Sequence, residues 1–181
     1  RAALEKEQGY KIFVFHTALT ELKTEELEAM ESIPFSLLPK NFNYYAGGHV
    51  HDVMEKSEND YGLIDYPGPL FPNRFRELEK LQNGGFYIVE DDKLSYEPVQ
   101  MCPVFSLTIN CGNKTPEEVN EILLKEIKNK EFNNTIVTIR LEGMLERGKP
   151  SSIDFKTIFE KLYEKSAYFV MKNTNKLSSR E

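Results

Sequence analysis

The segment Tyr44-Tyr-Ala-Gly-Gly-His-Val-His51 decides the interpretation of this chain, because it joins a strand-like run to two closely spaced histidines. Its aromatic and apolar start favours a β-strand. The two glycines relieve crowding where a backbone turns or approaches a ligand closely. His49 and His51 lie two residues apart, so in an extended segment both imidazoles project from one side. Neutral imidazole is the commonest metal-binding side chain, which makes the pair a candidate metal site.

His16 ends the preceding apolar run, Tyr10–Phe15, whose near-continuous hydrophobicity predicts a strand covered on both faces. A short helix is expected over Thr24–Met30, with Thr24 as its N-cap, and it would supply the crossover between two parallel strands. In open α/β sheets, ligands bind beyond the carboxyl ends of parallel strands. His16 and His49 would therefore meet if their strands are adjacent and parallel. Taken alone, His16 is also compatible with a hydrogen-bonded residue at the rim of a sheet.

The neighbouring segments leave the metal cluster incomplete. Arg1–Gln8 has the pattern of the end of a helix, and two strands separated by a loop are expected over Tyr61–Gly68 and Gly84–Val89. A two-metal hydrolase needs carboxylates besides histidines. The nearby candidates, none of which has a distinctive spacing, are Asp52, Asp60 and Asp65.

The two cysteines, Cys102 and Cys111, argue against a zinc-finger site, because neither lies near the histidines in the sequence. They flank an expected strand, which would hold their Cα atoms on the order of 30 Å apart, beyond the reach of a disulfide. We therefore expect free thiols in a reducing compartment.

The part of the chain beyond Pro98 has the pattern of a β-α-β-α-β unit. Thr115-Pro-Glu-Glu118 carries a capping box with proline at the first helical position, so a helix should begin there. Residues 173–181 are mostly polar and are expected to form a flexible tail. The expected strands cover residues 104–109, 135–141 and 167–171, and the expected helices begin near residues 115 and 154.

The composition bounds the class of protein. The 181 residues are 40% hydrophobic, with 29 acidic and 23 basic side chains and a net charge of −6. No apolar stretch approaches the roughly 20 residues that span a bilayer, and the acidic balance argues against a simple basic DNA-coating protein. Residues 96–181 hold 13 basic and 12 acidic side chains, whereas residues 1–95 hold 10 and 17. The resulting net charges of +1 and −7 favour a domain boundary near Ser95.

The order of four motifs resembles the second half of the calcineurin-like metallophosphoesterases, and more closely the double-strand-break repair nucleases of the meiotic recombination eleven family, the archaeal relatives of bacterial SbcD. The motifs are Phe13-Val-Phe-His16-Thr17, Tyr44-Tyr-Ala-Gly-Gly-His49-Val-His51, Tyr66-Pro-Gly-Pro69 and Gly85-Phe-Tyr-Ile-Val89. The resemblance implies an α/β fold. Residues 1–95 would be the carboxyl-side half of a four-layer α/β/β/α sandwich, and residues 96–172 a small β-α-β-α-β capping domain. Pro69 departs from the serine that usually follows Pro-Gly, and Thr20 stands where relatives carry a basic residue.

The resemblance also implies a site for two manganese ions. His16 and His49 would be ligands of one ion, and His51 a ligand of the other. The remaining ligands of such sites, and the histidine that assists the leaving group, belong to upstream Asp-x-His, Gly-Asp-x-x-Asp and Gly-Asn-His-Asp motifs that this sequence lacks. We therefore expect a piece of a longer protein that is inactive by itself.

The function that the resemblance implies for the intact protein is a DNA nuclease with 3'-5' exonuclease and single-strand endonuclease activity on DNA ends. It would act as a homodimer with an SMC-like ATPase subunit, in an archaeal or bacterial cytoplasm near the nucleoid, or in a eukaryotic nucleus. Candidate phosphate contacts in the capping domain are Arg140, Arg147 and Lys149, which a solvated surface would explain equally. The alternative is a phosphoesterase of small nucleotides or phosphoproteins, with the capping domain as a lid.

Overall fold

The chain has a mixed α/β fold, as expected, in the computed structural model, which describes residues 1–180. Over these residues it forms two compact units. Unit 1 combines Arg1–Phe71 with Gly84–Val99, and unit 2 combines Pro72–Asn83 with Gln100–Glu181. No helix within residues 1–180 is long and apolar enough to cross a membrane. The four-layer sandwich implied by the resemblance stays a prediction.

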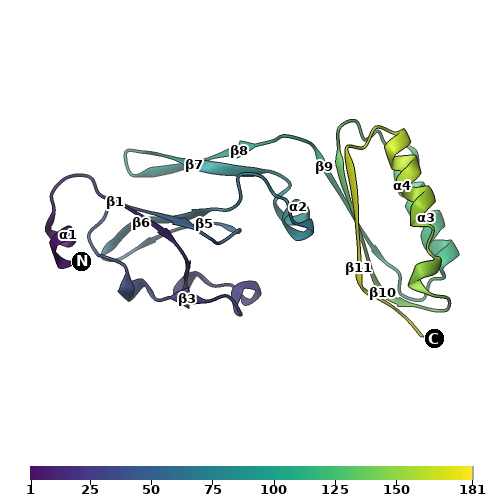
Figure 1. Cartoon of the computed structure of the whole chain (residues 1–181), viewed down its shortest axis with the longest axis horizontal. Coiled ribbons are helices and arrows are strands. Elements are labelled where there is room, and N and C mark those ends of the chain that lie inside the picture. The colour runs from purple at the N-terminus through teal and green to yellow at the C-terminus, as the bar shows by residue number, and fades with distance from the viewer. Residues whose placement is uncertain (181) are drawn as a thin grey trace. The chain divides into compact units, whose positions relative to one another are not determined.

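The central sheet of unit 1 has the strand order β1-β4-β6-β5. Three of its strands, β1, β5 and β6, are labelled in Figure 1. Its strands β1, β4 and β6 run parallel, and β5 pairs antiparallel with β6 as a hairpin. β1 and β4 are adjacent and parallel, which is the condition for His16 and His49 to meet. The four strands span Ile12–His16 (β1), Tyr44–Gly48 (β4), Val53–Glu58 (β5) and Tyr61–Pro67 (β6).

The core of unit 1 is built around two tyrosines that solvent does not reach. Tyr45 on β4 and Tyr66 on β6 are each 0% exposed. Each hydroxyl donates a hydrogen bond to a backbone carbonyl, Tyr45 to Pro39 and Tyr66 to Thr17, at 2.7 Å in both cases. Buried tyrosines normally need such a partner, because an unpaired hydroxyl in an apolar interior is costly. The other buried residues of this core are Ala18, Leu19, Phe35, Leu38, Val50 and Ile64.

The helix expected over Thr24–Met30 is wrong. The segment forms only a 3-10 turn, η2 (Glu25–Leu27), in which no residue is buried and the Thr24 side chain makes no capping hydrogen bond. A helix this short is marginal unless an apolar face is well buried, and here Leu27 and Met30 pack against the core while only partly buried. The crossover consists instead of η1 (Thr20–Leu22), η2, η3 (Phe35–Leu37) and the paired strands β2 (Ala18–Leu19) and β3 (Ser32–Ile33).

The sequence pattern does not reveal β5, the hairpin strand β8 (Lys93–Val99) or the short helix α2 (Phe75–Leu81), which belongs to unit 2. The chain begins with α1 (Ala2–Lys6), where the end of a helix is expected. The expected strand over Gly84–Val89 is present as β7 (Gly84–Glu90), which forms a hairpin with β8 (Lys93–Val99). Asp91 and Asp92 both have positive φ, as the two-residue turns favoured in hairpins require.

Unit 2 has the expected β-α-β-α-β order. Its three strands are parallel in the order β11-β10-β9, and the two helices lie side by side along one face of the sheet (Figure 1). The first helix begins at the predicted capping box, in which Glu118 N–H donates to Thr115 Oγ1 and Thr115 N–H to Glu118 Oε2. The elements are β9 (Val104–Asn110), α3 (Pro116–Lys128), β10 (Ile136–Leu145), α4 (Phe155–Glu164) and β11 (Phe169–Ser179). A 3-10 turn, η4 (Pro150–Ser152), precedes α4.

The flexible tail expected over residues 173–181 is wrong for the part that the structure describes. Residues 173–179 continue β11, whose register with β10 shifts once and then runs on to the pairing of Leu145 with Ser179. Leu177 is only 9% exposed and belongs to the core of unit 2. Leu177 is the one buried side chain of residues 173–179, and the polar composition of this segment gives no sign of it.

Candidate metal site

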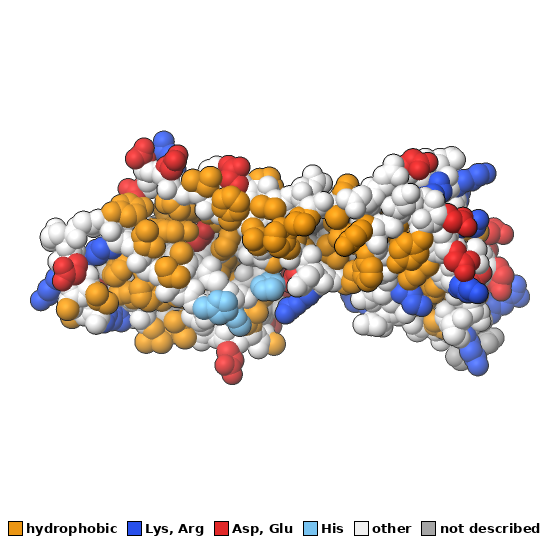
Figure 2. Space-filling model, turned by 45° about the horizontal axis from the view of Figure 1, so that its top comes forward, with side chains coloured by type: hydrophobic (Ala, Val, Ile, Leu, Met, Phe, Trp, Pro, Cys, Tyr) orange, Lys and Arg blue, Asp and Glu red, His pale blue; other side chains and the backbone are white. Residues whose placement is uncertain are grey.

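His16 and His49 lie next to each other at the carboxyl ends of β1 and β4. The parallel register aligns His16 with Gly48, and His49 follows directly. The two imidazole rings have their centroids 5.3 Å apart at an interplanar angle of 66°. Both side chains are exposed, and Figure 2 shows the histidine side chains in pale blue as a group at the surface. The condition for their meeting is therefore satisfied.

The two glycines before His49 are required by close contacts from two directions. A Cβ atom at Gly48 would lie 2.7 Å from His16 Nδ1, and one at Gly47 would lie 2.6 Å from the backbone oxygen of Asp65. Real Cβ contacts are longer than this, so any larger residue would displace its neighbour. Gly48 leaves room for the His16 ring, and Gly47 leaves room for β6.

His49 itself has a strained backbone. Its φ of 85° lies in the left-handed region, which residues other than glycine rarely adopt, although histidine does so more readily than most. Such a conformation costs on the order of 1–3 kcal/mol and persists only where the surrounding structure imposes it. The conformation turns the chain at the end of β4, where His49 contacts His16.

His51 lies in the connection between β4 and β5 and is half-buried. Its backbone packs against the Pro-Gly loop, since a Cβ atom at Gly68 would lie 3.2 Å from the His51 carbonyl oxygen. Gly68 also has a φ of 69°, which favours glycine. The loop that follows β6 therefore supports the backbone of His51.

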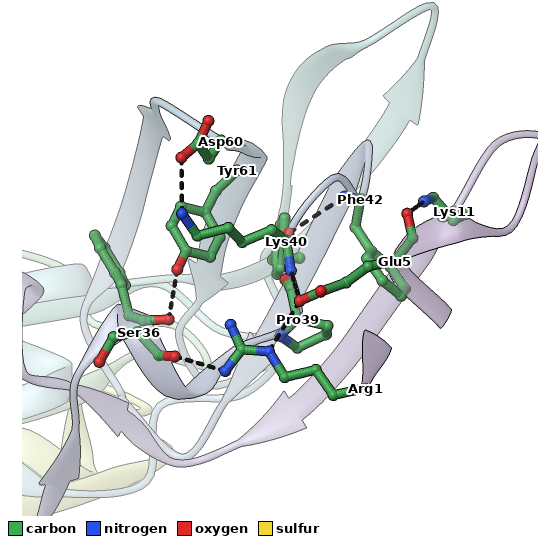
Figure 3. Close-up of polar contacts among 11 residues, drawn as sticks. Arg1, Glu5, Lys11, Ser36, Pro39, Lys40, Phe42, Asp60 and Tyr61 are labelled. Atoms are coloured by element: carbon green, nitrogen blue, oxygen red, sulfur yellow. Dashed lines mark hydrogen bonds and ion pairs between the residues drawn. The ribbon is translucent and has the colours of Figure 1, made fainter. Parts of the chain in front are cut away.

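The three carboxylates considered as further ligands lie in different environments. Asp60 is exposed and pairs with Lys40, the Nζ and Oδ2 atoms being 2.8 Å apart (Figure 3). Asp52 is half-buried, directly after His51. Asp65, on β6, is 1% exposed, and its backbone oxygen lies close to Gly47. Within residues 1–180, no group of three histidine, cysteine, aspartate or glutamate side chains is arranged to hold a metal ion.

Among the carboxyl groups of unit 1, that of Asp65 has the pKa that departs furthest from its ordinary value. Burial raises the pKa of its carboxyl group to about 6, although hydrogen bonds from the Tyr44 hydroxyl and the Gly47 N–H favour the charged form. Tyr44 donates to Oδ1 at 2.9 Å, and Oδ2 is buried with no hydrogen-bond partner among the described residues. Nothing in the sequence pattern distinguishes Asp65 from Asp52 and Asp60.

The donor set fits a metal ion only in part. Two neighbouring imidazoles are suitable ligands for transition metals, including manganese when oxygen ligands accompany them. A manganese centre needs more donors than the described residues gather around this pair. The chain thus presents a partial coordination shell, not a complete site.

The three cationic residues considered for DNA contacts are also in different environments. Arg140, on β10, donates to both carboxylate oxygens of Glu79 on α2, with N–O distances of 2.9 and 2.7 Å, and its guanidinium lies over the Phe75 ring. Arg147 and Lys149 are exposed, beyond the end of β10. Cys102 and Cys111, before and after β9, are free thiols, and Cys111 is buried.

Comparison with known proteins gives a similarity over part of the chain. No family model matches the chain. The chain is 32% identical over 105 residues to the DNA double-strand break repair protein Mre11 of Methanopyrus kandleri. The match covers 54% of this chain and 22% of that protein, so it spans less than a quarter of the relative's length. Over about half of the chain, this similarity supports the relationship to the double-strand-break repair nucleases of the metallophosphoesterase type.

Proposed function

We propose that this chain is part of a metal-dependent DNA nuclease of double-strand-break repair, to which it contributes His16, His49 and His51 as metal ligands. The observation that carries the proposal is the imidazole pair at the ends of two parallel strands, 5.3 Å apart between ring centroids. The similarity to a double-strand break repair protein supports the choice of DNA as the substrate class.

The histidines have separate roles in this proposal. His16 and His49 bind one manganese ion and His51 binds a second. The chemistry that bound manganese supplies is a hydroxide nucleophile at neutral pH and neutralisation of the charge that develops on the phosphoryl group. Each imidazole uses one ring nitrogen for the metal and keeps the other for a hydrogen bond that orients the ring. The glycines at positions 47 and 48 let the His16 ring and β6 approach closely enough for this arrangement.

The remaining ligands come from polypeptide outside these 181 residues, because the described residues gather no three-ligand cluster. We propose that this chain alone binds manganese weakly and does not cleave DNA. In the intact protein it would act on DNA ends, as a homodimer with an SMC-like ATPase subunit. Unit 2 would contribute phosphate contacts from Arg147 and Lys149, which are exposed, whereas Arg140 is engaged by Glu79.

The test is a calorimetric titration of the 181-residue chain with Mn²⁺, combined with a DNA cleavage assay. We expect His16→Ala and His49→Ala each to weaken binding by about tenfold or more, as loss of a metal ligand or its support does. Asp60→Asn is the control, because its carboxylate pairs with Lys40, and it should leave the affinity unchanged.

Two results would contradict the proposal. Mn²⁺ binding that neither histidine substitution weakens would exclude the imidazole pair as ligands. Robust manganese-dependent cleavage by the chain alone, abolished by His49→Ala, would show that no ligands from elsewhere are required.

A further inference from the structure

We infer that Tyr66 is a positioning residue that sets the relative placement of the His16 and His49 imidazoles. The inference rests on the proposed function, since the placement of the pair matters for a reaction only if the pair binds metal. Tyr66 is 0% exposed, so it cannot touch a substrate and must act through its neighbours.

The hydroxyl of Tyr66 holds the turn that follows His16. It donates to the carbonyl oxygen of Thr17, at 2.7 Å. Thr17 is the residue directly after His16, so the phenol fixes the backbone on which the first imidazole depends. The Thr17 carbonyl would lose this hydrogen bond if the hydroxyl were removed.

The ring of Tyr66 contacts β4, the strand that His49 follows. A Cβ atom at Gly47 would lie 2.7 Å from Tyr66 Cε1, so the ring occupies the space that any larger residue at position 47 would need. On the other side, the ring packs edge-on against Phe15, with centroids 5.7 Å apart. One side chain on β6 therefore contacts β1 one residue before His16 and β4 two residues before His49.

This arrangement has a physical consequence for metal binding. A coordination site functions only when its ligands are held within about 0.5 Å of the productive geometry by a packed supporting layer. His49 has a strained backbone and His16 ends an edge strand, so neither position is fixed by regular secondary structure alone. Tyr66 contacts the chain next to both histidines and therefore constrains the positions of both His16 and His49.

The chain contains a closely matched control for this inference. Tyr45 is also 0% exposed, donates its hydroxyl to the Pro39 carbonyl at 2.7 Å, and accepts from the Phe42 N–H. Its hydroxyl lies at the opposite end of β4 from the histidines. Tyr66→Phe and Tyr45→Phe should therefore both reduce thermal stability, because each removes a buried hydroxyl that donates to a backbone carbonyl at 2.7 Å.

The experiment compares the two variants by two measurements. Nitrogen-15 NMR of the three histidine side chains, in the metal-free protein, should show the His16 and His49 signals shifted in Tyr66→Phe and unchanged in Tyr45→Phe. Calorimetry with Mn²⁺ should show about tenfold weaker binding for Tyr66→Phe and less than a twofold change for Tyr45→Phe.

The outcomes separate this inference from the proposed function. Unchanged histidine signals and unchanged affinity in Tyr66→Phe, with stability reduced as in Tyr45→Phe, would show that Tyr66 is only a structural residue. If the wild-type chain binds no Mn²⁺ but the histidine signals shift in Tyr66→Phe alone, the positioning role stands and the metal-binding function falls.

Discussion

Individual residues at the ends of β1 and β4 show which parts of the candidate site a sequence can reveal. The meeting of His16 and His49 is predictable, because both histidines end apolar runs that form parallel strands. The need for small residues before His49 is also predictable from the two glycines. Tyr66 gives no such signal, because its partner Thr17 is 49 residues away and the contact depends on a strand order that no local pattern specifies.

Asp65 is a buried acid whose protonation should make the stability of the protein depend on pH. The pKa of its carboxyl group is raised from 3.8 to about 6 by burial, so the folded state binds the proton more tightly than the unfolded chain. Its contribution to the free energy of unfolding is therefore greatest below about pH 4, falls as the pH rises from about 4 to 6, and is constant above that. The total change is roughly 3 kcal/mol.

The matched variant for this prediction is Asp65→Asn, whose amide oxygen can still accept the hydrogen bond of Tyr44. Urea unfolding of both proteins at pH 4 and pH 8 isolates the contribution of this one group, because the other carboxylates are shared. We expect Asp65→Asn to be the more stable protein at pH 8 and to lose that advantage at pH 4. A stability difference that is independent of pH would contradict the raised pKa.

Among the elements, capped and strongly periodic segments are the predictable ones. The helix α3 begins where Thr115 and Glu118 form a capping box, and the order of strands and helices in unit 2 follows from alternating periods of hydrophobicity. The short helix expected over Thr24–Met30 does not form, because Thr24 makes no capping hydrogen bond and the apolar residues of the segment are only partly buried. β5 and α2 escape notice because they are short and carry charged residues.

β11 provides the test at this scale, because the sequence pattern places its second half in a flexible tail. Leu177→Ala should reduce the free energy of unfolding by about 2–4 kcal/mol, as expected when a buried leucine is truncated in a packed core. Ser178→Ala, on the neighbouring exposed position, should change it by less than about 0.5 kcal/mol. Equal and small effects in thermal or urea unfolding would show that residues beyond 173 contribute no packing.

The whole chain divides its charge unevenly, and this division bears on where DNA can bind. Residues 1–95, which carry all three histidines, hold 17 acidic and 10 basic side chains, whereas residues 96–181 hold 12 and 13. A polyanion is repelled by the first part unless bound cations neutralise it. In the absence of metal, the proposed function therefore locates DNA affinity within residues 96–181, where Arg147 and Lys149 are exposed.

Binding of a blunt-ended DNA duplex in the presence of a chelator, measured as a function of salt, checks this expectation. Each phosphate contact contributes about 0.9 to the slope of log affinity against log salt, so Arg147→Ala with Lys149→Ala should lower the slope by roughly 2. Lys156→Ala with Lys161→Ala removes the same charge from α4 and is the control, because it leaves the end of β10 intact. Equal changes in slope for both pairs would mean that only the net charge of unit 2 matters. An affinity that does not depend on salt would remove the argument for a DNA-binding surface in this chain, and would leave the imidazole pair as its sole link to phosphodiester chemistry.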